Sequence, residues 1–185
     1  IAGKKVTDDI QLGLSILHDQ AEKLKQGVGE CFVDLIREDE SVTIPGIAGR
    51  PPKEITKSIL AKIIQARMEE ILEIVAIELK RSGYADALSA GIVITGGGSL
   101  IRNVQVLASE ILGMDAKIGF PKGLAGGLTD EVDSPIYATG VGLVIHAFRT
   151  GQQSEPLGGS LLKDKGVDQI LGRITNRMKD WFKEF

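Results

Sequence analysis

Three consecutive glycines, Gly96 to Gly98, stand between a short apolar run and a stretch with helical spacing. A glycine turn at such a place lets a ligand lie against the backbone, and the free N–H groups at a helix start favour polar or anionic groups. The spacing around Ser99 is neither GxGxxG nor a P-loop with its lysine, which excludes the Rossmann and Walker interpretations. From spacing alone, a ligand-binding turn and a plain tight connection both stay open.

Before the C-terminal segment, few other residues have types and spacing that suggest a catalytic or metal-binding site. Glu22 and Lys25 stand one helical turn apart, which on pattern alone indicates a solvated ion pair. The acidic residues at 130, 131 and 133 lack the Ca²⁺-loop pattern, so we expect a polar loop before a helix. Cys31 has no histidine near it in sequence, and we expect a buried free thiol. We therefore predict no catalytic residue and no metal ligand.

The segment 167–185 has the clearest amphipathic pattern in the chain. On a wheel of about 100° per residue, its apolar side chains fall within a sector of roughly 120°. Tryptophan and phenylalanine suit the headgroup boundary, and the cations beside them can meet lipid phosphates. Packing back on the domain and binding in a partner's groove are the alternatives. The predicted membrane-binding residues are Ile170, Leu171, Ile174, Arg177, Met178, Trp181, Phe182, Lys183 and Phe185.

Composition limits the class of protein. The 185 residues are 43% hydrophobic and 25% charged, as in globular domains. The net charge of −3 argues against general nucleic-acid binding. A single cysteine excludes a disulfide scaffold and a thiolate zinc site. No apolar run reaches the ~20 residues that span a bilayer.

The elements that must position these residues follow from periodicity and turn signals. In the first half we expect Thr7, Asp8 and Asp9 to cap one helix that continues to about residue 26. Strands are expected at 30–36 and 41–44, and a long helix at 53–81, stopped by Ser82 and Gly83. The apolar positions of the long helix, including Ile59 and Val75, are expected on its buried side.

The second half alternates strand and helix, which predicts a βαβ layer. Ser134 and Pro135 are expected to open the last core helix, and residues 150–166 to form a flexible linker. The remaining predicted elements are a strand at 90–95, a helix at 99–112, a strand at 116–120 and a glycine-rich loop at 121–133.

Several stretches, in the same order, resemble the FtsA family of bacterial actin-like division proteins. The run Gly91-Ile92-Val93-Ile94-Thr95-Gly96-Gly97-Gly98 resembles the family's adenosine motif, and Trp181-Phe182-Lys183-Glu184-Phe185 resembles its terminal membrane-targeting helix. Ala2 and Asp8 depart from the family pattern at its first glycine and its asparagine. The other matching stretches lie at 3–14, 21–25, 49–52, 127–130 and 135–143.

The resemblance implies an α/β fold of the actin/Hsp70 type, also called ribonuclease H-like, with only the second half of its nucleotide-binding lobe present. Residues 1–26 and 84–149 would form subdomain 2A, and residues 27–83 an inserted α+β subdomain, 2B. Residues 150–166 would be the linker, and 167–185 the C-terminal amphipathic helix.

The resemblance also implies ATP as cofactor, with Mg²⁺ in the intact protein. Glu22 and Lys25 would hold the ribose or the adenine edge. The family's phosphate and Mg²⁺ loops are expected upstream of Ile1, so we expect no ATP hydrolysis and no tight ATP binding from this chain. The expectation is an ATP-binding scaffold and no enzyme. Gly97, Gly98 and Ser99 would line the adenine, and Gly96 is the remaining predicted nucleotide-binding residue.

The partners implied by the resemblance are the C-terminal tail of FtsZ, anionic lipids of the cytoplasmic membrane, other copies of the protein in filaments, and other division proteins. The tail would dock on 2B at Lys53, Arg67 and Glu70, whose spacing of 14 and 3 predicts one shared helical face. The location would be peripheral, on the cytoplasmic face of the inner membrane at the septum. The alternatives are a pilus-assembly type of actin-like scaffold, a sugar kinase of the same superfamily, and a helix-in-groove interaction module.

Overall fold

The computed structural model describes residues 2–46, 49, 51–124 and 130–153. The chain divides into two compact units, Ile1–Leu143 and Val144–Phe185. The residues from 154 on, and with them most of the predicted linker, lie outside the described residues. All nine predicted membrane-binding residues, from Ile170 to Phe185, lie outside them as well. No helix in the described ranges is both long and apolar enough to cross a bilayer.

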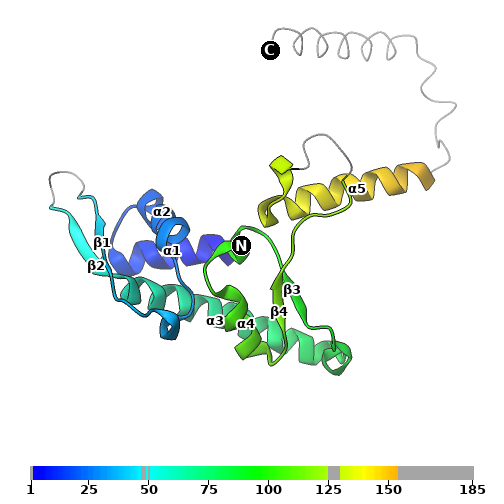
Figure 1. Ribbon diagram of the computed structural model, residues 1–185, viewed down its shortest axis with the longest axis horizontal. Helices are drawn as coiled ribbons and strands as arrows, with labels where there is room; N and C mark the ends of the chain where they lie inside the picture. The colour runs from blue at the N-terminus through cyan, green and yellow to red at the C-terminus, as the bar shows by residue number, and fades with distance from the viewer. Residues whose placement is uncertain (1, 47–48, 50, 125–129, 154–185) are drawn as a thin grey trace, which may run out of the picture. The chain divides into compact units, whose positions relative to one another are not determined.

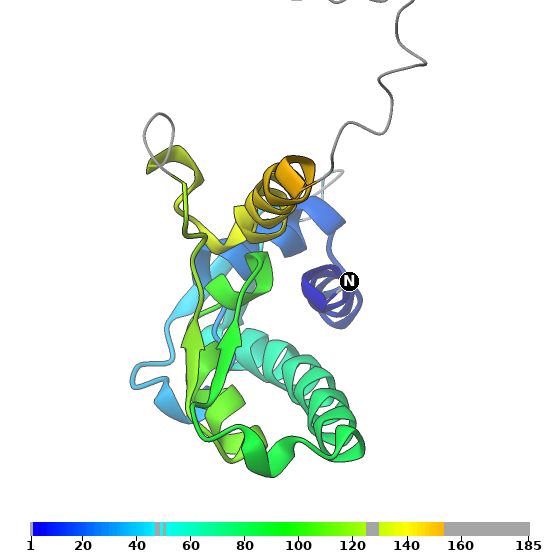
Figure 2. The ribbon, with the colours of Figure 1, turned by 90° about the vertical axis from the view of Figure 1, so that its right-hand side faces the viewer.

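The first unit is arranged around one long helix, α3 (Lys57–Ser82). Figure 1 shows the hairpin of β1 (Ser41–Ile44) and β2 (Lys53–Thr56) at one end of α3. The pair of β3 (Ile92–Ile94) and β4 (Ala116–Ile118) lies toward its other end. Helices α1 and α4 both pack on α3, which appears in Figure 2 as the long helix below α1.

The predicted single helix at the N-terminus is two helices, α1 (Ala2–Leu14) and α2 (His18–Val28). Ser15 takes the left-handed conformation, with φ of 53°, and this ends α1. The prediction that Thr7 caps a helix is therefore wrong, because Thr7 lies inside α1 and is buried. Gly13 permits close approach to α3, since a Cβ there would lie 3.0 Å from Cδ1 of Ile63.

The β1–β2 hairpin corrects two predictions. The strand at 41–44 is confirmed, but residues 53–56 form its antiparallel partner and not the start of the long helix. The expected strand at 30–36 is wrong: it contains a 3₁₀ turn, Val33–Leu35, and only an isolated bridge from Glu30 to Arg102.

Helix α3 ends as its sequence predicts. Gly83 has a φ of 74°, and its N–H donates to the Lys80 carbonyl at 3.2 Å. The buried stripe is narrower than the apolar pattern, because Ile59 and Val75 are exposed. The buried residues of the helix are Leu60, Ala61, Ile64, Met68 and Leu72.

The βαβ layer is confirmed. Strands β3 and β4 pair in parallel, with Ile92 opposite Ala116, and α4 (Val104–Leu112) lies between them in sequence. The expected helix at 99–112 begins later, after a 3₁₀ turn at Gly97–Leu100 and a left-handed Asn103. Short 3₁₀ turns also occur at Ala85–Ala87 and Asp130–Val132.

The last described helix, α5 (Ala138–Gln153), continues from the first unit into the second. It follows a 3₁₀ turn, Pro135–Tyr137, whose first residues are capped by the Ser134 side chain. The prediction that Ser134 and Pro135 open a helix is therefore confirmed. The assignment of residue ranges to subdomains 2A and 2B stays a prediction.

Candidate functional site

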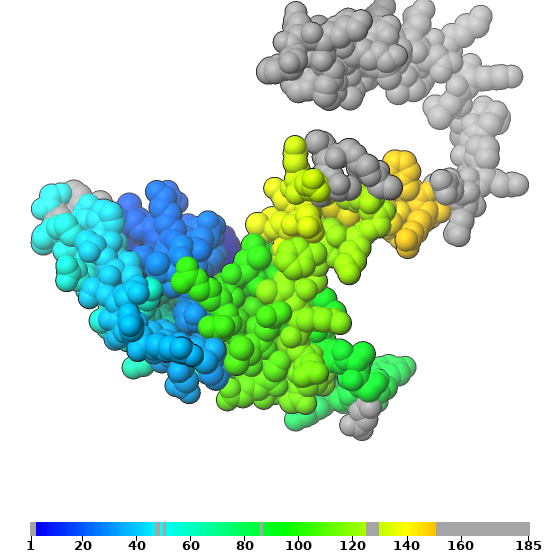
Figure 3. Space-filling view, viewed as in Figure 1, coloured from blue at the N-terminus to red at the C-terminus, as the bar shows by residue number. Residues whose placement is uncertain are grey.

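A cavity of about 1030 Å³ opens in the first unit between α1, α2, α3 and the glycine turn. One side is polar, lined by Thr7, Glu22 and Lys25, and another is formed by Gly96 to Ser99. In the space-filling view the green surface that includes the glycine turn adjoins the blue surface of the N-terminal helices (Figure 3), and the 3₁₀ turn at Gly97–Leu100 contacts α1. The cavity therefore brings together both groups that the sequence singled out.

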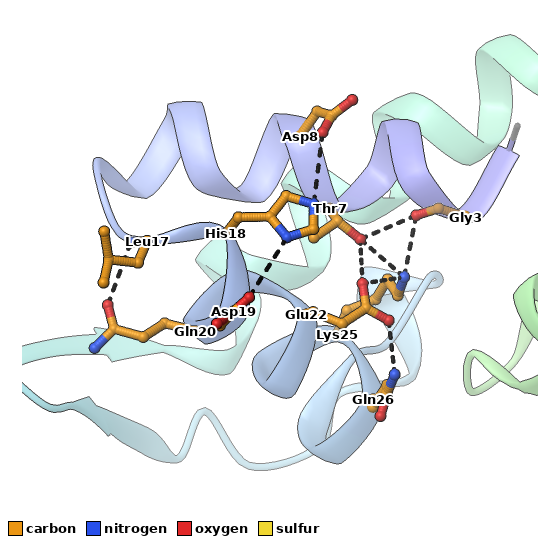
Figure 4. A network of polar contacts seen from close by, with 10 residues as sticks. All are labelled: Gly3, Thr7, Asp8, Leu17, His18, Asp19, Gln20, Glu22, Lys25 and Gln26. Atoms are coloured by element: carbon orange, nitrogen blue, oxygen red, sulfur yellow. Dashed lines mark hydrogen bonds and ion pairs between the residues drawn. The ribbon is translucent and has the colours of Figure 1, made fainter.

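Glu22 and Lys25 form the predicted ion pair, at 2.6 Å between Lys25 Nζ and Glu22 Oε2. The pair is not a plain solvated one, because only 11% of the Lys25 side chain is exposed and 34% of that of Glu22. Figure 4 shows that α1 joins the pair from above: Lys25 Nζ also donates to Thr7 Oγ1 at 2.8 Å and to the Gly3 carbonyl at 3.1 Å.

Thr7 belongs to this hydrogen-bond network, which the sequence pattern did not predict. Its hydroxyl is within donating distance of Glu22 Oε2, although the two residues stand 15 positions apart. Gln26 Nε2 donates to the other oxygen, Glu22 Oε1, at 2.7 Å. A residue buried on α1 has no sequence signal that assigns it to a group on α2, since only the packing of the two helices brings them together.

The network decides which atoms are left for a ligand. An ammonium has three donors, and those of Lys25 are all used by Glu22, Thr7 and Gly3. A carboxylate has about four lone-pair sites, and Glu22 accepts from Lys25, Thr7 and Gln26. Lys25 therefore holds Glu22 in place, and Glu22 keeps about one site that can accept a ligand hydroxyl.

The same contacts keep Glu22 ionised. Burial by itself raises the pKa of this carboxyl, but hydrogen bonds from Lys25, Thr7 and Gln26 and the charge of Lys25 lower the pKa to about 2. At neutral pH the group is thus a carboxylate that accepts hydrogen bonds and does not donate them.

The glycine turn presents backbone to the cavity. Gly96 has a φ of 88°, and its N–H donates to the Pro135 carbonyl at 3.1 Å. A Cβ at Gly98 would meet nothing within 4 Å, so the open surface there results from the absence of side chains. Ser99 is buried, and its hydroxyl donates to the Gly96 carbonyl at 2.7 Å. The hydroxyl therefore stabilises the turn itself.

The other predicted group, Lys53, Arg67 and Glu70, does not share one helical face. Lys53 lies on β2, and its ammonium donates to the Leu14 carbonyl at the end of α1, at 3.0 Å. Arg67 and Glu70 pair one turn apart on α3. Asp9 of α1, which the sequence did not indicate, accepts two hydrogen bonds from the Arg67 guanidinium.

Cys31 is buried, as predicted, and its Sγ–H donates to the Arg102 carbonyl at 3.1 Å. Burial and the nearby charge of Glu30 raise the pKa of the thiol to about 12, so it is a poor nucleophile. Within the described ranges, no group of three or more His, Cys, Asp or Glu residues could hold a metal ion.

Comparison with known proteins decides the family. The family model described as "Cell division protein FtsA" matches residues 1–142. The chain belongs to the FtsA family. It is 36% identical to the FtsA of Pseudomonas aeruginosa over 182 residues, covering 98% of this chain and 43% of that protein. With the FtsA of Escherichia coli K12 it shares 33% identity, covering 100% of this chain and 44% of that protein.

The FtsA of Bacillus subtilis is more distant, with 32% identity over 92% of this chain and 37% of its own length. The chain thus spans less than half the length of these relatives. The resemblance to the FtsA family is confirmed, and the chain belongs to a family of actin-like cell division proteins.

Solved structures support the expected fold. The MreB 5 of Spiroplasma citri bound to AMPPNP matches 83% of this chain and 45% of its own, with a TM-score of 0.63 and 23% identity. The ADP-bound form matches 84% of this chain and 47% of its own, with a TM-score of 0.61. The fold is therefore the actin/Hsp70-like α/β fold, as predicted.

Proposed function

We propose that this chain is the part of an actin-like division protein that tethers FtsZ filaments to the cytoplasmic membrane. It would bind the adenosine end of ATP in the cavity, the C-terminal tail of FtsZ near Arg67, and anionic lipid through residues 167–185. Membership of the FtsA family is the observation that carries the proposal. The protein would lie on the cytoplasmic face of the inner membrane at the septum.

The cavity supports adenosine as its occupant. Its volume exceeds that of a nucleoside, and Gly97 and Gly98 line it without side chains, which leaves their backbone accessible to a base. The remaining acceptor site of Glu22 suits a ribose hydroxyl. The solved MreB 5 structures are described as bound to AMPPNP and to ADP, which supports a nucleotide in this fold. We propose that the bound nucleotide, ATP or ADP, would change the tendency of the protein to polymerise. For this chain we propose the role of a scaffold and no catalytic role.

The surface near Arg67 supports an acidic tail as the partner. Lys53 and Arg67 place two cations on neighbouring elements, β2 and α3. Arginine favours bidentate contacts with carboxylates, which gives both affinity and orientation. We expect the carboxylates of the FtsZ tail to lie on these cations.

The amphipathic pattern of residues 167–185 supports a reversible anchor. One short helix of this kind binds a membrane only modestly, like a single lipid chain. Several helices joined in a filament would bind far more tightly without any new contact, because linked sites raise the effective concentration. Self-association is therefore part of the proposal.

One flotation experiment tests the tether. Anionic liposomes are mixed with FtsZ filaments and the full chain, with a version that ends at Gly166, or with the variant Arg67→Glu. We expect FtsZ to float with the full chain only. The shortened chain should leave both proteins at the bottom, and the Arg67→Glu chain should float without FtsZ.

The outcomes separate the parts of the proposal. If the shortened chain still floats, the terminal segment is not the anchor. If neither chain floats while both are folded, a helix-in-groove role replaces the membrane role. If FtsZ floats with the Arg67→Glu chain, the proposed docking surface is wrong.

A further inference from the structure

The guanidinium of Arg67 lies between two carboxylates of its own chain. Asp9, on α1, accepts from Nε and from Nη2, the latter at 3.0 Å to Oδ1. Glu70, one turn along α3, accepts from Nη1. A guanidinium has five N–H donors, and these contacts use three of them. One N–H on each terminal nitrogen is therefore left.

The two carboxylates hold Arg67 in different ways. Asp9 takes the side edge of the guanidinium, formed by Nε and Nη2, and its side chain is 27% exposed. Glu70 takes one terminal nitrogen and is 56% exposed. The outer edge, formed by Nη1 and Nη2, is the edge on which a partner carboxylate could bind in bidentate fashion. Of the two carboxylates, Glu70 bonds the nitrogen of that edge that Asp9 leaves, Nη1, and it is the more exposed.

Within the cluster of Arg67, Asp9 and Glu70, charge alone does not favour an acidic tail. One cation and two carboxylates give the cluster a net charge of −1. An arginine whose side edge is fixed loses little conformational freedom when its outer edge is bound. The geometry thus predicts opposite effects of the two side chains on the binding of a tail carboxylate: Asp9 favours it and Glu70 opposes it.

We propose that Asp9 is a positioning residue for the docking of the acidic tail, and that Glu70 occupies the place that a tail carboxylate takes over. Asp9 orients the outer edge of Arg67 toward solvent, and Glu70 must leave that edge when the tail binds. This inference rests on the proposed docking of the FtsZ tail at Arg67.

The variants Asp9→Asn and Glu70→Gln form a matched pair, because each removes one negative charge beside Arg67. Charge alone predicts that both bind an acidic peptide more tightly. We instead expect Glu70→Gln to bind about twofold to fivefold more tightly, and Asp9→Asn to bind about twofold to tenfold more weakly. The assay is fluorescence anisotropy with a labelled FtsZ tail peptide and the full chain, at about 0.1 M salt.

Two further variants show whether Asp9 acts through Arg67. In an Arg67→Ala background, adding Asp9→Asn is expected to weaken binding no further. Asp9→Glu keeps both carboxylate oxygens and is expected to restore part of the affinity that Asp9→Asn loses. Far-UV circular dichroism and thermal unfolding establish that each variant keeps its fold.

The results distinguish this inference from the docking itself. If Arg67→Ala leaves the affinity unchanged, the docking surface is wrong and the inference fails with it. If Arg67→Ala weakens binding while Asp9→Asn binds as tightly as the parent chain or more tightly, docking stands and positioning is wrong. If Glu70→Gln weakens binding, Glu70 contacts the tail and does not compete with it.

Discussion

Replacing Glu22 by Gln tests whether the network on α1 and α2 stabilises the fold. The contacts of Glu22 lower its pKa from 4.5 to about 2, a difference of about 2.5 units. At about 1.4 kcal/mol per pKa unit, this would correspond to roughly 3 kcal/mol for a group shielded from water. Because 34% of the side chain is exposed, solvent screening reduces the expected contribution to about 1–2 kcal/mol.

The pH dependence follows from the direction of the shift. A carboxyl whose pKa is lowered by folding stabilises the folded state above its unfolded pKa of about 4.5, and this contribution disappears as the pH falls through about 2. The difference in unfolding free energy between the parent chain and Glu22→Gln should therefore have its maximum value, about 1–2 kcal/mol, at pH 7. By about pH 3 it should fall to less than half.

The chain offers a matched control in Glu78 and Arg81, which form an ion pair with the same order and spacing at 2.9 Å. Both side chains are mostly exposed, so Glu78→Gln should change stability by no more than about 0.5 kcal/mol at any pH. Urea unfolding followed by far-UV circular dichroism is the suitable assay, since the single tryptophan, Trp181, lies outside the described residues. Equal losses for the two variants at pH 7, or a Glu22 effect that does not diminish toward pH 3, would refute the reasoning.

Three further outcomes are expected. Gly98→Leu should abolish adenosine binding to the chain with the fold intact, whereas Gly27→Leu, also in open space but not a lining residue of the cavity, should not; titrations monitored by NMR compare them. Cys31 should resist iodoacetamide at pH 8 until the chain is unfolded, which mass spectrometry detects. Gly91→Ala should lower the melting temperature and cost about 2 kcal/mol or more, because Gly91 has a φ of 79° and a Cβ would lie 2.3 Å from the Asp115 carbonyl oxygen.

Local patterns predicted the elements whose signals are complete within a few residues. The glycine at 83, after a helical period, predicted the end of α3, and two short β-branched runs around a helix predicted the parallel pair. The break at Ser15 carries no such signal, because a non-glycine residue takes the left-handed conformation there. The strand at Lys53–Thr56 also escaped prediction, since its partner strand lies across a loop.

In the candidate site, too, contacts within one helical turn were predictable and contacts between distant segments were not. The pair of Glu22 and Lys25 was predictable because one helical turn joins them. Thr7 and Asp9 were not, because they reach their partners from 15 and 58 positions away. Lys53 was placed on the wrong element for the same reason: its distance of 14 residues from Arg67 fits a helix, but β2 pairs with β1 instead.

Helix α1 links the two proposed binding sites through polar contacts. Thr7 and the Gly3 carbonyl meet Lys25 at the cavity, and Asp9 and the Leu14 carbonyl meet Arg67 and Lys53. Thr7 and Asp9 stand two positions apart, so a helix that moves as a rigid body cannot shift at one residue without shifting at the other. An assay of either site should therefore include the other. A variant of α1 that weakens both peptide and adenosine binding has moved the helix, and one that weakens peptide binding alone has changed only the contact with Arg67.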